Sequence, residues 1–229
     1  MKVATLARLS RATVALALAA TILSCSGEDK GAEKTPAVMD QGTVIRELNM
    51  MMDQKQQARG ALDSLVAEFG WQSPQAQEAS RHEKEIDSTS VVRLEQIIAQ
   101  FGWPGKSVVG DQAALAAFLV LQYADLATQE KYLPLVKAAA DKGDVEPMHL
   151  AMFQDRVLMR QGKPQIYGTQ LWNDPSTGEL GLYQIEDSAG VDLRREEVGL
   201  GPLDEYLRSM GLDPDTLKPQ TPGLEIIVK

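Results

Sequence analysis

The sequence predicts a mainly α-helical domain that carries a β-hairpin towards its C-terminal end. Aromatic residues make up only 5% of the 229 residues, whereas Ala, Leu, Met and Gln are plentiful, a composition that favours helix over sheet. Apolar residues recur at spacings of three and four over long stretches, as on one face of a helix. Only around residues 166–186 does the pattern change, to two short strand-like segments separated by the turn sequence NDPSTG.

The first 24 residues have the pattern of a bacterial export signal. Three basic residues and no acidic one precede a short apolar stretch at 12–22, which is the right length for a signal peptide and too short to span a bilayer comfortably. The run Ile22-Leu23-Ser24-Cys25 resembles a lipobox, in which cleavage before the cysteine leaves its thiol to carry a lipid. We therefore expect a signal peptide at 1–24, a lipid on Cys25 and a flexible linker at 25–37, followed by one mainly helical domain at 38–229.

Composition excludes several classes of function. Removing residues 1–24 takes away three basic residues, so the net charge falls from −9 to −12, which argues against binding to nucleic acid or to an anionic membrane surface. Cys25 is the only cysteine, so the mature domain has no thiol nucleophile once a lipid occupies it. No HExxH, Cys/His cluster, P-loop, GxGxxG or GxSxG sequence is present, and we expect neither a metal nor a cofactor.

The first two predicted helices cover 38–69 and 74–101. Ser73 is expected to cap the second helix, with proline at its first position. Both helices end in the sequence Phe-Gly-Trp, and Gly70 and Gly102 suit the left-handed position that follows a helix. Because solenoids need three or more copies, two similar helix ends are a better interpretation than a repeat protein.

The remaining predicted elements are two further long helices, then the hairpin, where the periodicity becomes strand-like, and finally two short helices. The third helix is apolar nearly all round at first, so we expect it to be central. The predicted order is a helix at about 111–130, kinked or restarted at Pro134 and continuing to Lys142, a helix at 147–161, the hairpin at 166–186, and short helices near 191–198 and 202–210.

Five segments resemble an uncharacterised bacterial family, a domain of unknown function. They are FGWPGKSVVG (101–110), LQYADLATQ (121–129), MFQDR (152–156), QIYGTQ (165–170) and VDLRREEVGL (191–200). The family shares a GWP loop, an H-A-D helix, a D-R helix and a Y-G-T-Q segment, and the likeness runs from about Asp53 to Tyr206. Members often have His at the position of Tyr123, so a general base or metal ligand there is lacking in this chain. The resemblance implies one folding unit and little about chemistry.

Two acidic residues stand where the helical patterns predict burial. Leu115, Phe118, Gln122, Asp125 and Gln129 fall on one stripe of the third helix, which begins apolar and becomes polar.

In the fourth helix, Asp155 interrupts an apolar face of methionines. A buried carboxylate needs a partner. Arg156 is adjacent and points elsewhere, so Arg194 or Arg195 is expected to pair with Asp125 or Asp155.

These residues suggest a single polar cluster with two acids beside an arginine. The cluster would contain Gln122, Asp125, Asp155, Gln165, Tyr167, Gln170 and Arg194 or Arg195. Tyr123, Gln129 and Arg156 are further candidates for ligand binding. Asp125 and Asp155 are the candidates for catalysis, as base and electrostatic stabiliser.

Three functions remain open at this point. The first is a lipid-anchored binding module of the cell envelope, facing the periplasm or the exterior, whose partner is a small molecule or another envelope protein. The second is a metal-independent envelope hydrolase or transferase that uses Asp125 and Asp155. The third is a purely structural lipoprotein, because buried Asp–Arg–Gln–Tyr networks often only fix helix packing. A ligand site predicts a cluster that opens to solvent, whereas a structural role predicts one that is sealed and fully hydrogen-bonded.

Overall fold

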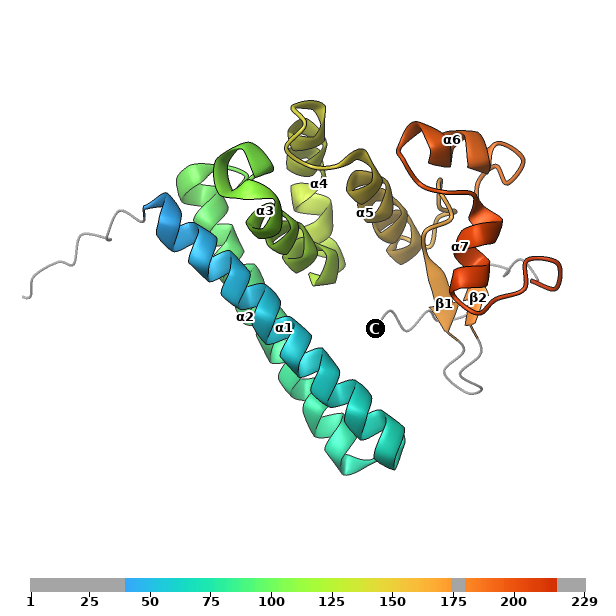
Figure 1. The fold of residues 1–229 in the computed structure, drawn as a ribbon, viewed down its shortest axis with the longest axis horizontal. Helices are drawn as coiled ribbons and strands as arrows, with labels where there is room; N and C mark the ends of the chain where they lie inside the picture. Colours follow the sequence, from blue (N-terminus) through green and yellow to red (C-terminus); the bar gives the residue numbers. More distant parts are fainter. Residues whose placement is uncertain (1–39, 174–179, 218–229) are drawn as a thin grey trace, which may run out of the picture. The chain divides into compact units, whose positions relative to one another are not determined.

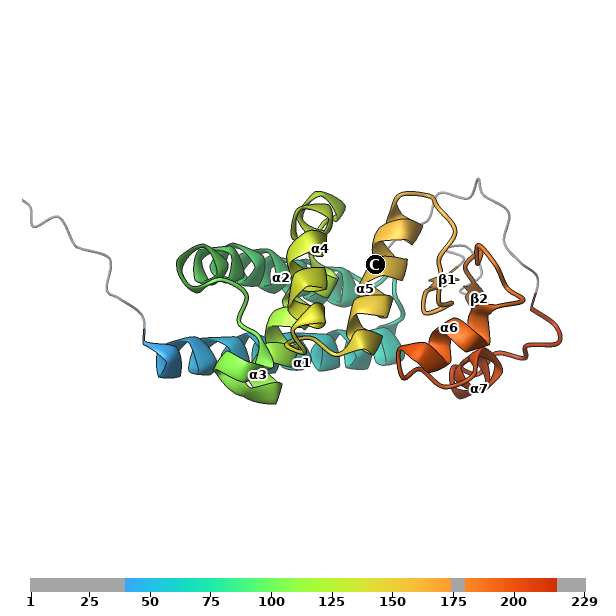
Figure 2. The same cartoon turned by 90° about the horizontal axis from the view of Figure 1, so that it is seen from above.

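The computed structural model describes residues 40–173 and 180–217, which are mainly helical with one small antiparallel sheet (Figures 1 and 2). The predicted fold class is therefore confirmed. The predicted signal peptide and linker, with Cys25, lie outside the described residues. The elements are α1 (Gln41–Phe69), α2 (Pro74–Phe101), α3 (Lys106–Tyr123), α4 (Leu126–Asp141), α5 (Pro147–Arg160), β1 (Leu171–Asn173), β2 (Leu180–Leu182), α6 (Val191–Glu197) and α7 (Leu203–Ser209).

Helices α1 and α2 lie side by side as a helical hairpin (Figures 1 and 2). The predicted Ser73 cap is confirmed, because its side chain accepts a hydrogen bond from Ala76 N at 3.2 Å. Gly70 and Gly102 end the two helices with φ values of 80° and 77°, as expected for glycine. Their ψ values of 158° and −167° are extended, however, so neither glycine adopts the expected left-handed helical conformation.

The third predicted helix is divided at Ala124–Asp125, and no new helix starts at Pro134, so the expected restart there is wrong. Asp125 caps α4 by accepting a hydrogen bond from Thr128 N at 2.8 Å. Gln129 then binds the end of α3, because its Nε2 donates to two carbonyls of the last turn at 2.9 and 3.1 Å. These capping bonds end one helix and start the next, and Pro134 lies inside α4.

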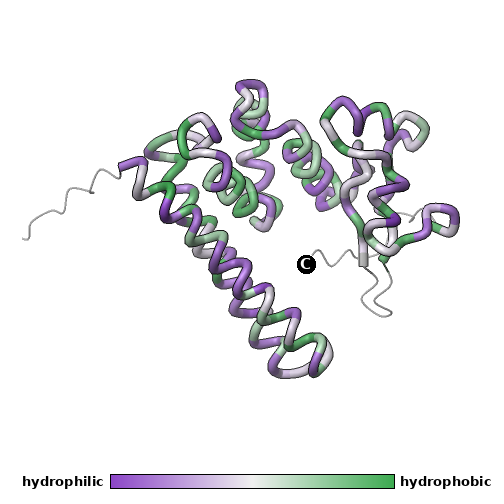
Figure 3. The backbone as a smooth tube through the Cα atoms, viewed as in Figure 1, coloured by the Kyte–Doolittle hydropathy of each residue, from purple (hydrophilic) through white to green (hydrophobic). Residues whose placement is uncertain are grey.

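The first apolar cluster is centred on α3, as its hydrophobicity predicts. Phe118 and Leu121 of α3 are 2% and 0% exposed, and they pack with side chains of α1, α2, α4 and α5, including Leu48, Leu94 and Phe153. Most of α3 is coloured hydrophobic in Figure 3, whereas hydrophilic stretches dominate the middle of α1. Among the described residues, no helix has the length and hydrophobicity needed to cross a membrane.

The second apolar cluster joins the hairpin to the last two helices. It consists of Val191, Leu203 and Leu207, with Leu171, Leu182, Ile185 and Tyr206 among the side chains around it. The strands pair in antiparallel register with Trp172 opposite Gly181, and they are shorter than predicted. Residues 166–170 form a loop instead of a strand, because several of their backbone groups bind side chains, as described next, whereas Gln165 forms an isolated bridge with Ile185.

Candidate functional site

The carboxylate of Asp155, on α5, accepts hydrogen bonds from four donors of the loop at 165–170. Its Oδ1 accepts from Ile166 N at 2.7 Å and from Tyr167 N at 3.0 Å. Its Oδ2 accepts from Thr169 N at 3.0 Å and Thr169 Oγ1 at 2.9 Å. The side chain is 0% exposed, so the expected burial is confirmed. Both carboxylate oxygens are therefore occupied by the protein itself.

The loop is completed by its own glutamines. Gln165, also 0% exposed, donates from Nε2 to Gln170 O at 3.0 Å and to Tyr183 O at 2.7 Å, and its Oε1 accepts from Gln170 N at 2.8 Å. Gln170 donates to Thr169 Oγ1 at 3.0 Å. Gly168 has a φ of 69°, and a Cβ atom there would come within 3.0 Å of Leu203 Cδ1. The conformation of the loop therefore depends on the buried side chains of Asp155, Gln165 and Gln170 and on the space beside Leu203.

The two arginines of α6 bind the carbonyls of the same loop, and the expected direct pairing with Asp125 or Asp155 is wrong. Arg194 donates from Nε to Ile166 O at 3.0 Å and pairs with Asp187 at 3.1 Å. Arg195, 2% exposed, donates to Tyr167 O at 2.8 Å and to Gly201 O at 2.6 Å. The loop donates its N–H hydrogen bonds to the Asp155 carboxylate, and two of its carbonyls accept hydrogen bonds from the arginines. We call this set, Asp155, Gln165, Tyr167, Gln170, Arg194 and Arg195, the loop network.

Asp125 is not part of the loop network. It is exposed and caps α4, and hydrogen bonds from Thr128 hold the pKa of its carboxyl below the usual value. The expected single stripe through Gln122, Asp125 and Gln129 was wrong because α3 ends at Tyr123. The enzymatic hypothesis needs two acids in one cluster. Among the described residues, no hydrogen bond brings Asp125 and Asp155 together.

The other candidates gather at the break between α3 and α4. Gln122 and Gln129 are 3% and 0% exposed, and the Oε1 atom of each is buried without a hydrogen-bond partner in the described part of the chain. Tyr123 is 42% exposed, and the Nζ atom of Lys55 lies 4.2 Å from its ring centroid. Buried polar atoms without partners are uncommon in proteins, so this region differs from the loop network.

Arg156 and Arg160 of α5 face this break, and Arg160 was missed by sequence reasoning. Arg160 Nη1 donates to Ala124 O, and Arg156 lies within electrostatic range of Tyr123. The Nε atoms of both arginines are buried and have no hydrogen-bond partner among the residues that the structure describes. The sequence contains a signal that could have identified both arginines, because neither has an acidic residue three or four positions away on its helix with which to form an ion pair. We call Gln122, Tyr123, Gln129, Arg156 and Arg160 the arginine site.

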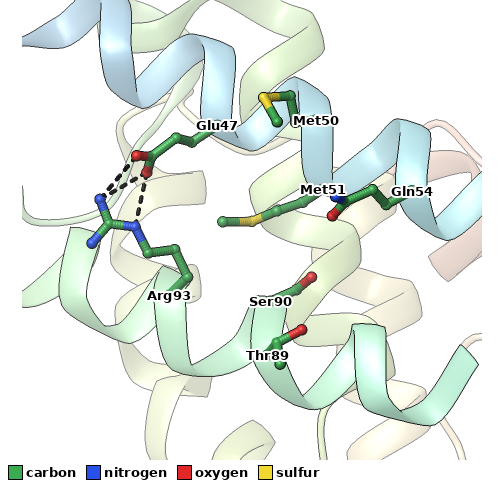
Figure 4. Close-up of a pocket in the computed structure, with 7 residues that line it drawn as sticks. All are labelled: Glu47, Met50, Met51, Gln54, Thr89, Ser90 and Arg93. Atoms are coloured by element: carbon green, nitrogen blue, oxygen red, sulfur yellow. Dashed lines mark hydrogen bonds and ion pairs between the residues drawn. The ribbon is translucent and has the colours of Figure 1, made fainter. Parts of the chain in front are cut away.

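A hollow of about 230 Å³ between α1 and α2 is a weaker candidate (Figure 4). Its lining residues are Glu47, Met50, Met51, Gln54, Thr89, Ser90 and Arg93. Glu47 and Arg93 reach towards each other and form an ion pair at 2.8 Å, so the charges of the hollow neutralise one another. None of the residues predicted from the sequence to form a site lies in it.

The two polar sets differ in what they can do chemically. In the loop network every oxygen of the acid and every glutamine group described above meets a protein partner, as in a structural network. The arginine site keeps cationic donors and amide oxygens that still lack partners, and such groups are suited to hold a polar ligand or water. Within 40–173 and 180–217, no group of three His, Cys, Asp or Glu side chains is arranged to hold a metal ion.

Comparison with known proteins assigns the chain to a family. A model described as a family of unknown function, DUF6624, matches residues 43–218, so the chain belongs to that family. This agrees with the uncharacterised family expected from the sequence and extends the match at both ends. No curated protein and no solved structure matches the chain.

Proposed function

We propose that this member of the DUF6624 family is a lipid-anchored binding module of the bacterial cell envelope, and that it holds its ligand at the arginine site. The sequence supports the anchor, through the lipobox-like run that ends at Cys25. The geometry supports the binding site, because the arginine site contains two buried Nε donors and two buried amide oxygens without a hydrogen-bond partner among the described residues. The loop network serves as its support, since it fixes the chain that follows α5.

The state of Arg156 is the observation that carries this proposal. Its side chain is partly buried, and it forms no ion pair or hydrogen bond with any residue that the structure describes. Arginines buried for structural reasons normally bind carbonyls or acids, as Arg195 does in the loop network. A partly buried guanidinium without such partners is costly for the folded state, and ligand sites are where such costs are tolerated.

The geometry gives less support to a hydrolase or transferase. Asp155 is enclosed by four donors, and Asp125 is occupied in capping α4. A general base needs access to the proton that it removes, which the enclosed Asp155 lacks, and no hydrogen bond of the described residues brings the exposed Asp125 together with Asp155.

Replacing Arg156 with methionine is expected to leave the unfolding free energy unchanged or to raise it, by up to about 1–3 kcal/mol. Methionine keeps the apolar contacts of the arginine stem and removes a donor that has no partner. Urea unfolding of the full chain measures the change. Arg81→Met is the control, because Arg81 is exposed on α2 and its loss should change stability by less than about 0.5 kcal/mol. A clear loss of stability in Arg156→Met alone would show that Arg156 is structural, and the proposed site would have to be abandoned.

Replacing Cys25 with alanine is expected to release the protein from membranes. A lipid on Cys25 contributes about 0.8 kcal/mol of membrane affinity for each buried methylene, and the domain itself carries a net negative charge. Partitioning of the full chain between detergent-rich and aqueous phases measures the anchor. The parent should enter the detergent phase and the variant should stay in the aqueous phase. Equal partitioning of both chains would rule out the lipid anchor without affecting the arginine site.

A further inference from the structure

We propose that Arg156 and Arg160 bind an oxyanion, a carboxylate or a phosphate group, which supplies the counter-charge that the described residues do not provide. This inference rests on the proposed binding function and names the chemical class of its ligand. It follows from the placement of the two arginines, from the absence of an acid facing Arg156 among residues 40–173 and 180–217, and from the hydrogen-bonding geometry of guanidinium groups.

The helix places both arginines on one face. Positions 156 and 160 are four residues apart on α5, so their side chains lie one above the other. Arg160 is directed towards the break between α3 and α4, where its Nη1 atom donates to Ala124 O. The Nε atoms of both arginines are buried and lack partners in the described ranges, so donors remain on two neighbouring guanidinium groups.

The acids near these arginines are already engaged. Asp155 precedes Arg156 but points to another face of α5, where it binds the loop at 165–170. Asp125 lies within electrostatic range of Arg160, but its carboxylate caps α4. Apart from Arg160, the charged or titratable side chains of the described residues that act on Arg156 are the phenols of Tyr123 and Tyr206, and neither is a carboxylate.

Two other partly buried cations of the described residues, Lys55 and Arg194, each pair with an acid. Lys55 pairs with Glu83 at 3.0 Å and with Asp87 at 2.7 Å. Arg194 pairs with Asp187 at 3.1 Å. Arg156 departs from this pattern, which indicates that its counter-charge comes from outside the described chain.

The electrostatic environment of Arg156 supports the same conclusion. Burial lowers the pKa of its guanidinium, and the positive charge of Arg160 lowers it further. Because arginine nevertheless stays protonated in proteins, these effects destabilise a charge that is present. A bound anion offsets both effects at once, whereas a neutral acceptor offsets only the loss of hydration and a cation adds to the repulsion.

The shape of the guanidinium group selects the class of anion. Its planar fork of N–H donors matches two oxygens of one carboxylate or phosphate, and such paired hydrogen bonds are stronger than those to neutral acceptors. A second arginine one turn away offers donors to a third oxygen or to a second anionic group. Chloride has no such set of oxygens, so it provides a control of equal charge and different geometry.

The proposal is tested by titrating the full chain with inorganic phosphate and, separately, with succinate. Each titration is matched in ionic strength with sodium chloride, and thermal unfolding is followed. We expect saturable stabilisation of the parent by at least one of the two oxyanions, beyond that given by chloride. Arg156→Met and Arg160→Met should weaken the apparent affinity by about 10- to 100-fold, and Arg81→Met should leave it unchanged.

The outcomes separate the ligand class from the site. Stabilisation by phosphate alone or by succinate alone supports the proposal and identifies the kind of oxyanion. Equal stabilisation of the parent and both arginine variants reflects exclusion of these salts from the protein surface and overturns the proposal. No stabilisation of the parent also overturns it, while the proposed binding site still stands if Arg156→Met keeps its stability. If Arg156→Met fails to fold, Arg160→Met and Arg156→Lys give the same comparison, with Lys keeping the charge and losing the fork.

Discussion

Replacing Asp155 with asparagine is expected to lower the free energy of unfolding by about 3–5 kcal/mol, because several hydrogen bonds to a buried charged group are weakened or lost and each contributes about 1.5–3 kcal/mol. The carboxylate is 0% exposed and accepts from three backbone N–H groups and one hydroxyl. If the Oδ1 position becomes the amide NH₂, Ile166 N loses its acceptor and Tyr167 N keeps only its longer contact of 3.2 Å with Oδ2; if the Oδ2 position does, Thr169 N loses its acceptor. Water cannot replace the lost acceptor without opening the loop at 165–170.

Urea unfolding of the full chain measures this effect, and Asp125→Asn is its matched control. Asparagine caps a helix about as well as aspartate does, so the control should change stability by less than about 0.5 kcal/mol. Asp125→Ala removes the cap and should cost about 1 kcal/mol. If Asp155→Asn were as stable as the control, the loop would be held by other contacts, and Asp155 would again be a candidate for catalysis.

The size of the expected effect follows from where Asp155 stands between the two apolar clusters. Its neighbour Phe153 belongs to the first apolar cluster, on the same helix. The loop that it binds is joined to the second apolar cluster through Tyr206, which donates to Thr169 O at 3.0 Å. Breaking the carboxylate bonds therefore weakens the connection between the two clusters as well as the loop itself.

Much of the helical fold could be predicted from local sequence signals. The bounds of α2 and α5 follow from a proline at the first helical position and from the residues that end each helix. The break between α3 and α4 was missed, although Asp125 followed by Thr128 three residues later is compatible with a helix cap. Continuous apolar periodicity through this region outweighed a signal of only one or two residues. Pro134, the stronger breaker by propensity, is accommodated inside α4.

The polar sites could be predicted only in part. Burial of Asp155 followed from the apolar face on which it lies, and that expectation was confirmed. Its partners could not be predicted, because they are mainly backbone N–H groups of Ile166, Tyr167 and Thr169, which every such residue carries. A search for side chains of opposite charge therefore led to Arg194 and Arg195, which bind the carbonyls of the same loop.

Replacing Gln165 with leucine is the second substitution with a large expected effect, a loss of about 2–5 kcal/mol in unfolding free energy. Leucine has a similar size and fits the buried space, but it makes none of the three hydrogen bonds of this 0% exposed side chain. Gln170 O keeps its hydrogen bond from Tyr183 N at 3.2 Å. Gln170 N and Tyr183 O lose the bonds that Gln165 supplies, and each buried group left unpaired costs about 1–3 kcal/mol.

Urea unfolding measures the loss, with Gln100→Leu as the control, since Gln100 is exposed on α2. Hydrogen exchange adds a local readout, because the Gln170 amide should lose its protection before the amides of α3 do. Uniform loss of protection would mean that Gln165 acts on global stability alone. Faster exchange confined to 165–173 and 180–186 would instead mean that the glutamine sets the entry to the hairpin. In that case the loop network is the element that orients the chain after α5, and Arg156 is left without an ion pair among the described residues because Asp155, the acid beside it, binds the loop.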